Sequence, residues 1–235
     1  MRRIVRDDAR HPDPAFAELY ASFPDATDLD PWLAWCRAAA GPVLYVGVGA
    51  GRLAVPLAAA GVDLVGVDVH PGMLVRLRER LPDLPLVEGR IEEVNLGRRF
   101  PLVIGPSGIL ADPARLAGAA RHTSRRLGLE LTNPHWLLAG GGRGVRVLDS
   151  TREWAEIEVD YPGGWTHRAR VRMRWPEDAH ALLAGAGLEL EVMRGQDPDA
   201  DLEESPTYFV LGRLRQPGAG RRRRRAPGIL SSLGP

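Results

Sequence analysis

Hydrophobic residues recur in short blocks along the chain, and the blocks follow two alternating patterns. Some are continuous apolar runs, such as VLYVGV from Val43, which are typical of strands buried on both faces of a sheet. Others place apolar residues three and four positions apart, as amphipathic helices do. This alternation predicts a parallel sheet with helices on both faces, that is, a doubly wound α/β fold. The expected strands are 43–48, 62–67, 84–88, 101–105 and 126–132, and the expected helices are 52–60, 71–80 and 112–122.

The two ends of the chain depart from this pattern. Beyond residue 132, two stretches alternate apolar with polar residues on either side of Pro162-Gly163-Gly164, which predicts an antiparallel hairpin with one solvated face. Two short helices are expected ahead of the sheet. The last two strands should form an antiparallel end that brings the sheet to seven strands. These outer elements are helices 14–24, 28–40 and 176–185 and strands 188–193 and 207–214.

The length of 235 residues suits one α/β domain with a sizeable core. We expect that domain to span residues 1–215, with a helical cap at 1–40 and the hairpin as an insertion at 143–175 over the substrate side. Residues 216–235 combine proline, glycine and arginine with little apolar content, so they predict a disordered, arginine-rich tail.

Charge and cysteine content exclude several classes of protein. The formal charge is +1, and it becomes −4 (+1 minus 5) without the run Arg221 to Arg225, so no extended basic surface for nucleic acid is expected. The single cysteine, Cys36, can form neither an internal disulfide nor a cysteine-based zinc site, and no metal is expected. No apolar stretch has the length of a signal peptide or a membrane span, which predicts a cytoplasmic protein without membrane contact.

The most informative chemistry lies where the first strand of the sheet ends. There the chain reads GVGAG, with Gly47, Gly49 and Gly51 in alternate positions, and Asp68 follows seventeen residues later at the end of the next strand. Glycines let the backbone bend sharply and let a ligand approach it closely. An acid at the neighbouring strand end is placed to accept hydrogen bonds from both ribose hydroxyls. The dinucleotide fingerprint G-x-G-x-x-G requires a third glycine where Arg52 stands, which disfavours a nicotinamide cofactor.

This glycine loop, together with VDVHPGML, LVEGRIEEV and FPLVIGPSGIL in that order, resembles the class I S-adenosylmethionine-dependent methyltransferases over about residues 41–215. The resemblance implies S-adenosylmethionine as cofactor and S-adenosylhomocysteine as product. It also implies that the three glycines cradle the methionine and ribose, and that Asp68 holds the ribose hydroxyls. Met73 and Ile91 are then expected to flank the adenine.

Two positions depart from the family pattern. Tyr45 stands where an acid commonly helps to hold the methionine ammonium, and Arg90 stands where an acid often accepts from the adenine amino group. Backbone carbonyls can receive the ammonium, and a guanidinium can stack on an adenine, so both remain candidate cofactor contacts. The departures keep two alternatives open: a methyltransferase-fold protein that does not methylate, as a binding or scaffolding protein or another enzyme, and a nicotinamide-dependent oxidoreductase.

The sequence says less about the acceptor site than about the cofactor site. His135 follows the fifth strand of the sheet and is the preferred general base, because an imidazole titrates near neutral pH. His167 on the hairpin is a second candidate. The resemblance implies methyl transfer to an oxygen or nitrogen of a small molecule, in specialised metabolism, by a monomer or a homodimer. The aromatic candidates for its pocket are Tyr20, Trp32, Trp136, Trp154 and Trp165.

Overall fold

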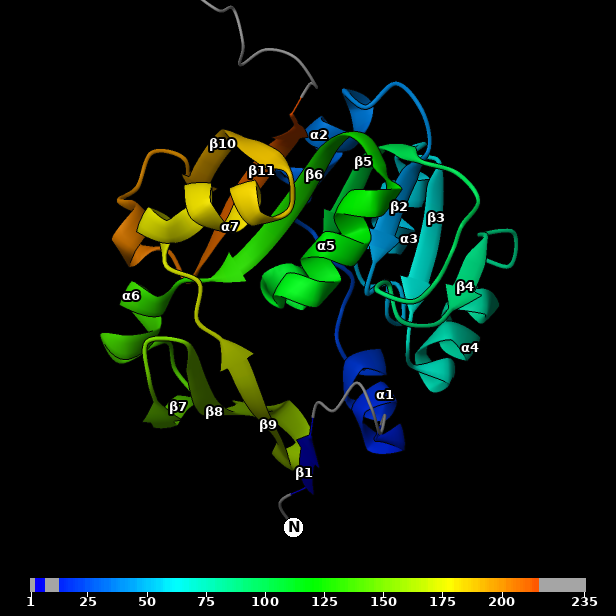
Figure 1. The fold of residues 1–235 in the computed structure, drawn as a ribbon. Helices are drawn as coiled ribbons and strands as arrows, with labels where there is room; N and C mark the ends of the chain where they lie inside the picture. The colour runs from blue at the N-terminus through cyan, green and yellow to red at the C-terminus, as the bar shows by residue number, and fades with distance from the viewer. Residues whose placement is uncertain (1–2, 7–12, 216–235) are drawn as a thin grey trace, which may run out of the picture.

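The computed structural model describes residues 3–6 and 13–215 (Figure 1). The expected tail, with its run Arg221 to Arg225, lies outside the described residues. None of the helices in the described part of the chain combines the length and apolarity needed to cross a bilayer.

The main element of the fold is a seven-stranded sheet in the order β10-β11-β6-β5-β2-β3-β4. Strands β6, β5, β2, β3 and β4 run parallel, and β11 runs antiparallel to both of its neighbours. The predicted α/β class with an antiparallel end is therefore confirmed. The strands are β2 (Val43–Val46), β3 (Leu64–Asp68), β4 (Leu86–Glu88), β5 (Phe100–Gly105), β6 (Thr123–Thr132), β10 (Leu188–Gly195) and β11 (Thr207–Leu214).

Helices cover both faces of this sheet because neighbouring strand residues point to opposite sides (Figure 1). Leu44 packs with α5 and α7 in one apolar cluster, whereas Val43 packs with α2, α3 and α4 in another. The helices are α2 (Trp32–Arg37), α3 (Ala54–Ala59), α4 (Pro71–Arg80), α5 (Pro113–His122) and α7 (Ala179–Gly185), with single 3-10 turns at Ile109–Ala111, Pro176–Asp178 and Leu202–Glu204.

A second sheet of four strands, ordered β1-β9-β8-β7, lies below the carboxyl ends of the parallel strands in Figure 1. The predicted hairpin across Pro162–Gly164 is present as the β8–β9 pair, with Tyr161 opposite Trp165. The sheet differs from the expectation in two ways, because Thr151 makes a turn that divides the first stretch into β7 and β8, and because β1 adds in parallel to β9. Its strands are β1 (Arg3–Arg6), β7 (Val145–Ser150), β8 (Trp154–Tyr161) and β9 (Trp165–Arg172).

The helices outside the main alternation are short. The first predicted helix is α1 (Pro14–Ala21), which begins where the Asp13 side chain accepts a hydrogen bond from Ala15 N. The second is α2, six residues long instead of thirteen. The five-residue helix α6 (Pro134–Leu138) follows β6 directly. Helix α1 lies beside the small sheet and below the main one, so both cap the carboxyl ends of the parallel strands (Figure 1).

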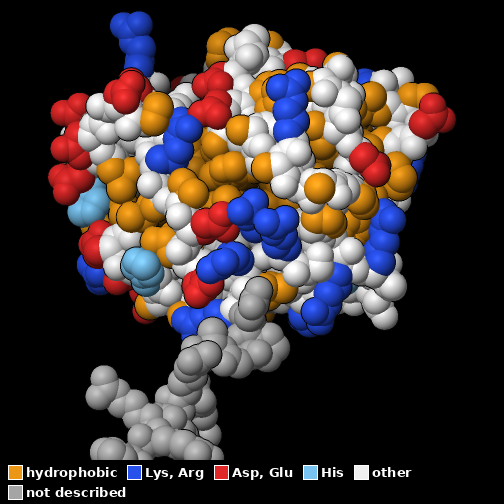
Figure 2. Space-filling view, turned by 90° about the horizontal axis from the view of Figure 1, so that it is seen from above, with side chains coloured by type: hydrophobic (Ala, Val, Ile, Leu, Met, Phe, Trp, Pro, Cys, Tyr) orange, Lys and Arg blue, Asp and Glu red, His pale blue; other side chains and the backbone are white. Residues whose placement is uncertain are grey.

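The opposite end of the molecule is seen in Figure 2, which looks down from the top of Figure 1. Basic, acidic and apolar side chains are interspersed on this face. Among the described residues visible there, no broad area carries charge of one sign, so this face provides no extended electrostatic surface.

Close packing of α5 on the loop after β4 leads to a stability prediction. A Cβ atom at Gly118 would lie 2.8 Å from Glu92 Cα and 2.8 Å from the Ile91 carbonyl oxygen. We expect Gly118→Ala to lower the free energy of unfolding by about 1–3 kcal/mol in urea denaturation, since backbone cannot yield as a side chain can. Gly185→Ala is the matched control, because open space surrounds that position. It should be neutral or stabilise by up to about 1 kcal/mol; equal losses in both variants would contradict this account of the packing.

Candidate cofactor and acceptor site

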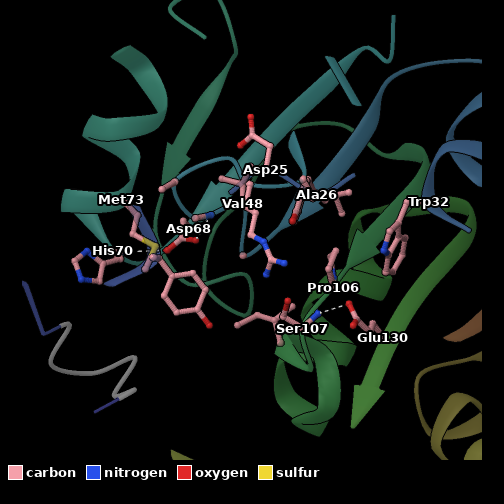
Figure 3. A pocket seen from close by; sticks show the side chains of 18 of the residues that line it. Asp25, Ala26, Trp32, Val48, Asp68, His70, Met73, Pro106, Ser107 and Glu130 are labelled. Carbon is pink, nitrogen blue, oxygen red and sulfur yellow. Dashed lines mark hydrogen bonds between the residues drawn. The ribbon is translucent and has the colours of Figure 1, made fainter. Parts of the chain in front are cut away.

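A cavity of about 600 Å³ lies between the carboxyl ends of the parallel strands and the cap formed by α1. Figure 3 shows Asp68 and Met73 on one side of it and Ser107, Glu130 and Trp32 on the other. Ligands of open α/β sheets bind in this position, so the cavity is the candidate site.

The glycine loop forms one wall of the cavity, and its three glycines serve different purposes. All three have positive φ, at 73°, 55° and 92° for Gly47, Gly49 and Gly51. Gly47 and Gly49 line the cavity. Gly51 does not, and a Cβ there would lie 2.5 Å from Leu77 Cδ1 of α4. The first two glycines therefore expose backbone to a ligand, whereas the third is required by packing.

Asp68 is held rigidly at the end of β3. Its Oδ2 accepts a hydrogen bond from Gly49 N at 2.7 Å, and its Oδ1 accepts one from His70 N at 2.8 Å. Burial raises the pKa of this carboxyl, and these backbone donors oppose the shift. Each carboxylate oxygen can accept a second bond, so both ribose hydroxyls of an adenosyl group can be satisfied here. The position and free acceptor capacity of the Asp68 carboxylate therefore fit an adenosyl ligand.

A narrow recess continues from the main cavity past Asp68 and matches the position expected for an adenine. Ile91, 3 % exposed, and Arg90 line it. The Arg90 guanidinium does not lie unpaired over the recess, because Glu92 and Glu93 bind it as ion pairs. Glu92 also lines the recess. A carboxylate, that of Glu92, is thus present near the adenine position, two residues after the position at which the family pattern has one.

Met73 and Tyr45 complete the cofactor side of the cavity. Met73 is buried on α4, and its Sδ would lie 3.3 Å from a Cβ at Gly49. Tyr45 is 5 % exposed in the middle of the sheet and lines the same cavity. Burial, with the nearby Glu130 and Asp68 charges, raises the pKa of the Tyr45 phenol, which therefore stays neutral and can donate a hydrogen bond.

Glu130 is the site residue that sequence reasoning missed. It lies near the end of β6, lines the cavity, and accepts a hydrogen bond from Ser107 N at 2.9 Å through Oε2. Burial raises the pKa of its carboxyl, and the Ser107 bond and the Arg52 charge oppose that shift. The signal was present in the sequence, because a charged residue interrupts the otherwise apolar LGLEL at the end of a buried strand.

The predicted aromatic residues separate into two groups. Tyr20 on α1 and Trp32 on α2 line the cavity, as expected for a substrate wall. Trp136, Trp154 and Trp165 do not. Trp136 packs in the apolar cluster of the small sheet, and arginines cover the other two rings, with Arg170 over Trp154 and Arg3 over Trp165. These three tryptophans stabilise the small sheet. They are not in position to contact a substrate in the cavity, contrary to the prediction.

Neither predicted histidine base reaches the cavity. His135 is turned away on α6, where its ring packs edge-on against Trp175 at 5.0 Å and its Nε2 lies 3.3 Å from Glu177 Oε2. The helix begins directly after β6 because Asn133 caps it, and this rotates His135 outward. His167 is buried on β9, with its ring 5.0 Å from Phe16. Neither imidazole is therefore placed to act as the general base in this cavity, contrary to the prediction.

Comparison with known proteins decides the family. Residues 43–127, which hold the glycine loop, Asp68 and the adenine recess, match a family described as a methyltransferase domain. The chain is a class I S-adenosylmethionine-dependent methyltransferase.

Two relatives and two solved structures extend this likeness. The chain is 27% identical over 197 residues to a ubiquinone biosynthesis O-methyltransferase of Azorhizobium caulinodans, covering 73% of this chain and 70% of the relative. It is 29% identical over 186 residues to a dTDP-3-amino-3,6-dideoxy-alpha-D-glucopyranose N,N-dimethyltransferase of Streptomyces fradiae, with coverage of 66% and 73%.

The solved structures share the fold of this methyltransferase. The CcbJ methyltransferase from Streptomyces caelestis is 22% identical, with a TM-score of 0.66 over 86% of this chain and 96% of its own. The glycopeptide N-methyltransferase MtfA, solved with S-adenosylhomocysteine, is 19% identical, with a TM-score of 0.60 over 86% and 98%.

The partly buried carboxyl of Glu130 gives this methyltransferase a pH-dependent cost in stability. A raised folded-state pKa means that ionised Glu130 destabilises the fold above that pKa and that the penalty vanishes as the pH falls toward the ordinary value of 4.5. We therefore expect Glu130→Gln to melt at a higher temperature than the wild type at pH 8, with the difference narrowing toward pH 4.5. Differential scanning calorimetry across this range measures it.

The matched control for this stability prediction is Glu189→Gln, which removes an exposed acid paired with Arg213 at the far end of the sheet. It should change the melting temperature little and with no such trend. A Glu130→Gln protein less stable than the wild type at pH 8 would contradict the desolvation argument.

Proposed function

We propose that this methyltransferase transfers a methyl group from S-adenosylmethionine to an oxygen or nitrogen of a small molecule, in specialised metabolism. The observation that carries the proposal is the single cavity that joins the glycine loop and Asp68 to Glu130 and the capping elements. The two relatives act on an oxygen and on an amino sugar nitrogen respectively, which supports both acceptor atoms.

We propose that one side of the cavity binds the cofactor and the other side binds the methyl acceptor. Backbone at Gly47 and Gly49 receives the methionine and ribose portions, Asp68 holds the ribose, and Met73, Ile91, Arg90 and Tyr45 complete the cofactor side. When bound, S-adenosylmethionine supplies a methyl group already activated by its sulfonium. The chain therefore has to align the acceptor, exclude water and manage any proton that the acceptor loses. Tyr20 and Trp32 are proposed to wall the acceptor.

Binding and transfer test the proposal separately. Calorimetry should show 1:1 binding of S-adenosylhomocysteine and no binding of NADH, which also addresses the oxidoreductase alternative. With methyl-labelled S-adenosylmethionine, label should enter pools of small amines or phenols and not tRNA or protein. Label confined to a macromolecular fraction, or binding of S-adenosylhomocysteine with no transfer to any pool, would contradict the proposal and favour the non-methylating alternative.

A further inference from the structure

We propose that Glu130 is a catalytic residue that recognises an ammonium group and removes its proton, so that the acceptor is an aliphatic amine and the enzyme an N-methyltransferase. This inference rests on the proposed function and specifies its acceptor atom. The role is assigned to a carboxylate at the end of β6, in place of the histidines that the sequence suggested.

The position of Glu130 is fixed from two directions. Ser107 N donates to its side chain at 2.9 Å, and Gly108 N donates to its backbone carbonyl at 3.0 Å. The turn after β5 is thereby clamped to the end of β6. The second carboxylate oxygen, Oε1, accepts no hydrogen bond from the residues that the structure describes. A rigidly held carboxylate with one oxygen open to the cavity can receive a cationic donor.

The surroundings of Glu130 favour a cation over an anion. Six carboxylates and three guanidinium groups line the main cavity. The cation whose charge acts on Glu130 is Arg52; its Nε also donates to the Pro24 carbonyl at 3.1 Å, and its guanidinium lies 5.8 Å from the Phe23 ring centroid. The carboxylates are Asp13, Asp25, Asp28, Asp30, Asp68 and Glu130, of which Asp25 and Asp30 form ion pairs with Arg80 and Arg194 outside the lining.

Aromatic rings enclose the recess on the acceptor side of Glu130. Tyr20 from α1 and Tyr161 from β8 line this recess together with Phe23, Glu130 and the one guanidinium among the described residues there, that of Arg52. The rings form a continuous row, with centroids 5.2 Å apart from Tyr20 to Phe23 and 4.7 Å apart from Phe23 to Tyr161. Ring faces attract ammonium groups, including methylated ones, so the recess suits an amine both before and after transfer.

Besides the carboxylates and guanidinium groups of the cavity wall, the titratable groups that the described residues place near Glu130 are three phenols. The phenols of Tyr45, Tyr20 and Tyr161 face the cavity or its recess, and burial raises the pKa of Tyr45 and Tyr161. Arg52 is the cation that stabilises the Glu130 charge, and Asp68 is the acid that contributes to the same field at Tyr45. Because Tyr45 and Tyr161 stay neutral, Glu130 is the group beside the aromatic recess that can accept a proton.

Burial makes an amine a better acceptor than a hydroxyl beside this carboxylate. Proton transfer from an ammonium to Glu130 converts an ion pair into two neutral groups, which a poorly solvated site favours. Transfer from a hydroxyl would leave an alkoxide, so the negative charge would only move to a much weaker acid. The carboxylate of Glu130 is therefore matched to an ammonium.

Glu130 Oε1 takes one proton from the acceptor ammonium and becomes a neutral carboxylic acid. The nitrogen lone pair forms a bond to the methyl carbon while the carbon–sulfur bond breaks and its electron pair returns to sulfur. The product is an N-methylammonium together with a neutral thioether. Glu130 then releases its proton to solvent through the open cavity.

Binding of a matched pair of probes tests the inference without knowledge of the natural acceptor. Both are S-adenosylhomocysteine analogues in which nitrogen replaces sulfur; one carries a 2-aminoethyl arm at that nitrogen and the other a 2-hydroxyethyl arm. Because a charge-assisted hydrogen bond is stronger than a neutral one, calorimetry of the wild type should give at least about tenfold tighter binding of the amino probe. Glu130→Gln should remove this preference, and Glu189→Gln should keep it.

S-adenosylhomocysteine itself separates the inference from the proposed function. Glu130→Gln should bind it as the wild type does, which also shows that the variant is folded. Equal binding of the two probes by the wild type, or a preference that survives Glu130→Gln, would overturn the amine assignment and leave the proposed function intact. Weaker binding of S-adenosylhomocysteine by a folded Glu130→Gln would assign Glu130 to the cofactor ammonium instead. Failure of the wild type to bind S-adenosylhomocysteine would overturn both proposals.

Discussion

Gly49→Val is expected to abolish binding of S-adenosylhomocysteine while the sheet stays folded. Gly49 has a φ of 55°, and a Cβ there would lie 3.3 Å from Met73 Sδ at the cavity wall. A β-branched residue at positive φ costs roughly 1–3 kcal/mol, so the loop is strained as well as filled. The valine methyl groups would then occupy the space proposed for the cofactor. Calorimetry should detect no binding, while circular dichroism shows an unchanged secondary structure.

Gly61→Val is the matched control for this variant. Gly61 also has positive φ, at 83°, but nothing lies within 4 Å of the Cβ position in the turn after α3. Gly61→Val should therefore introduce similar backbone strain without changing the affinity for S-adenosylhomocysteine. If both variants bind S-adenosylhomocysteine alike, the glycine loop does not form the cofactor cradle.

Asp68→Ala should weaken binding of S-adenosylhomocysteine by roughly 1.5–3 kcal/mol, the scale of hydrogen bonds to a charged group. This corresponds to a dissociation constant about 10- to 150-fold higher. Two contributions act together, because the ribose loses its acceptor and because Gly49 N and His70 N lose the carboxylate that orders the loop. Titration calorimetry of the purified variant measures the change.

The control for Asp68 is another aspartate that accepts from backbone. In the turn before β11, the Asp201 side chain accepts a hydrogen bond from Glu203 N at 3.0 Å. Asp201 does not line the cavity. Asp201→Ala should cost about 0.5–2 kcal/mol of stability, as loss of a capping bond does, and should leave cofactor affinity unchanged. An Asp68→Ala protein with wild-type affinity would remove Asp68 from the proposed site.

The cofactor side of the site could be predicted from the sequence, because each feature that defines it lies within a short segment of the chain. Alternate glycines after an apolar strand predict a bend that exposes backbone, and Asp68 ends the adjacent strand. Parallel pairing of β2 with β3 then brings the two together without any further information. Gly51 shows the limit of this reasoning, because its need for glycine comes from Leu77 on a helix that the local pattern does not place.

The acceptor side could not be predicted in the same way, because it depends on contacts between distant segments. The parallel pairing of β1 with β9 joins residues more than 150 positions apart. His135 was expected to face the cavity because it follows β6, but capping by Asn133 starts a helix that turns it outward. Glu130 gains its role from Ser107, which comes from the end of a different strand. Contacts of this kind depend on how distant segments pack together, which the hydrophobic periodicity of each segment does not reveal.

Glu130 also illustrates how a functional group can oppose stability. Its carboxyl is held where burial raises its pKa, so the ionised form is unfavourable in the folded protein. A neutral glutamine would keep the Ser107 contact and avoid that cost. The presence of an acid at this position is therefore explained by chemistry more readily than by folding.

A crystal structure of the protein with S-adenosylhomocysteine would decide whether the glycine loop and Asp68 hold the cofactor. We expect both ribose hydroxyls within hydrogen-bond distance of the Asp68 carboxylate, roughly 2.5–3.2 Å, with the homocysteine over Gly47 and Gly49 and the sulfur directed toward Glu130. A ligand bound elsewhere, or a ribose that makes no contact with Asp68, would contradict this expectation.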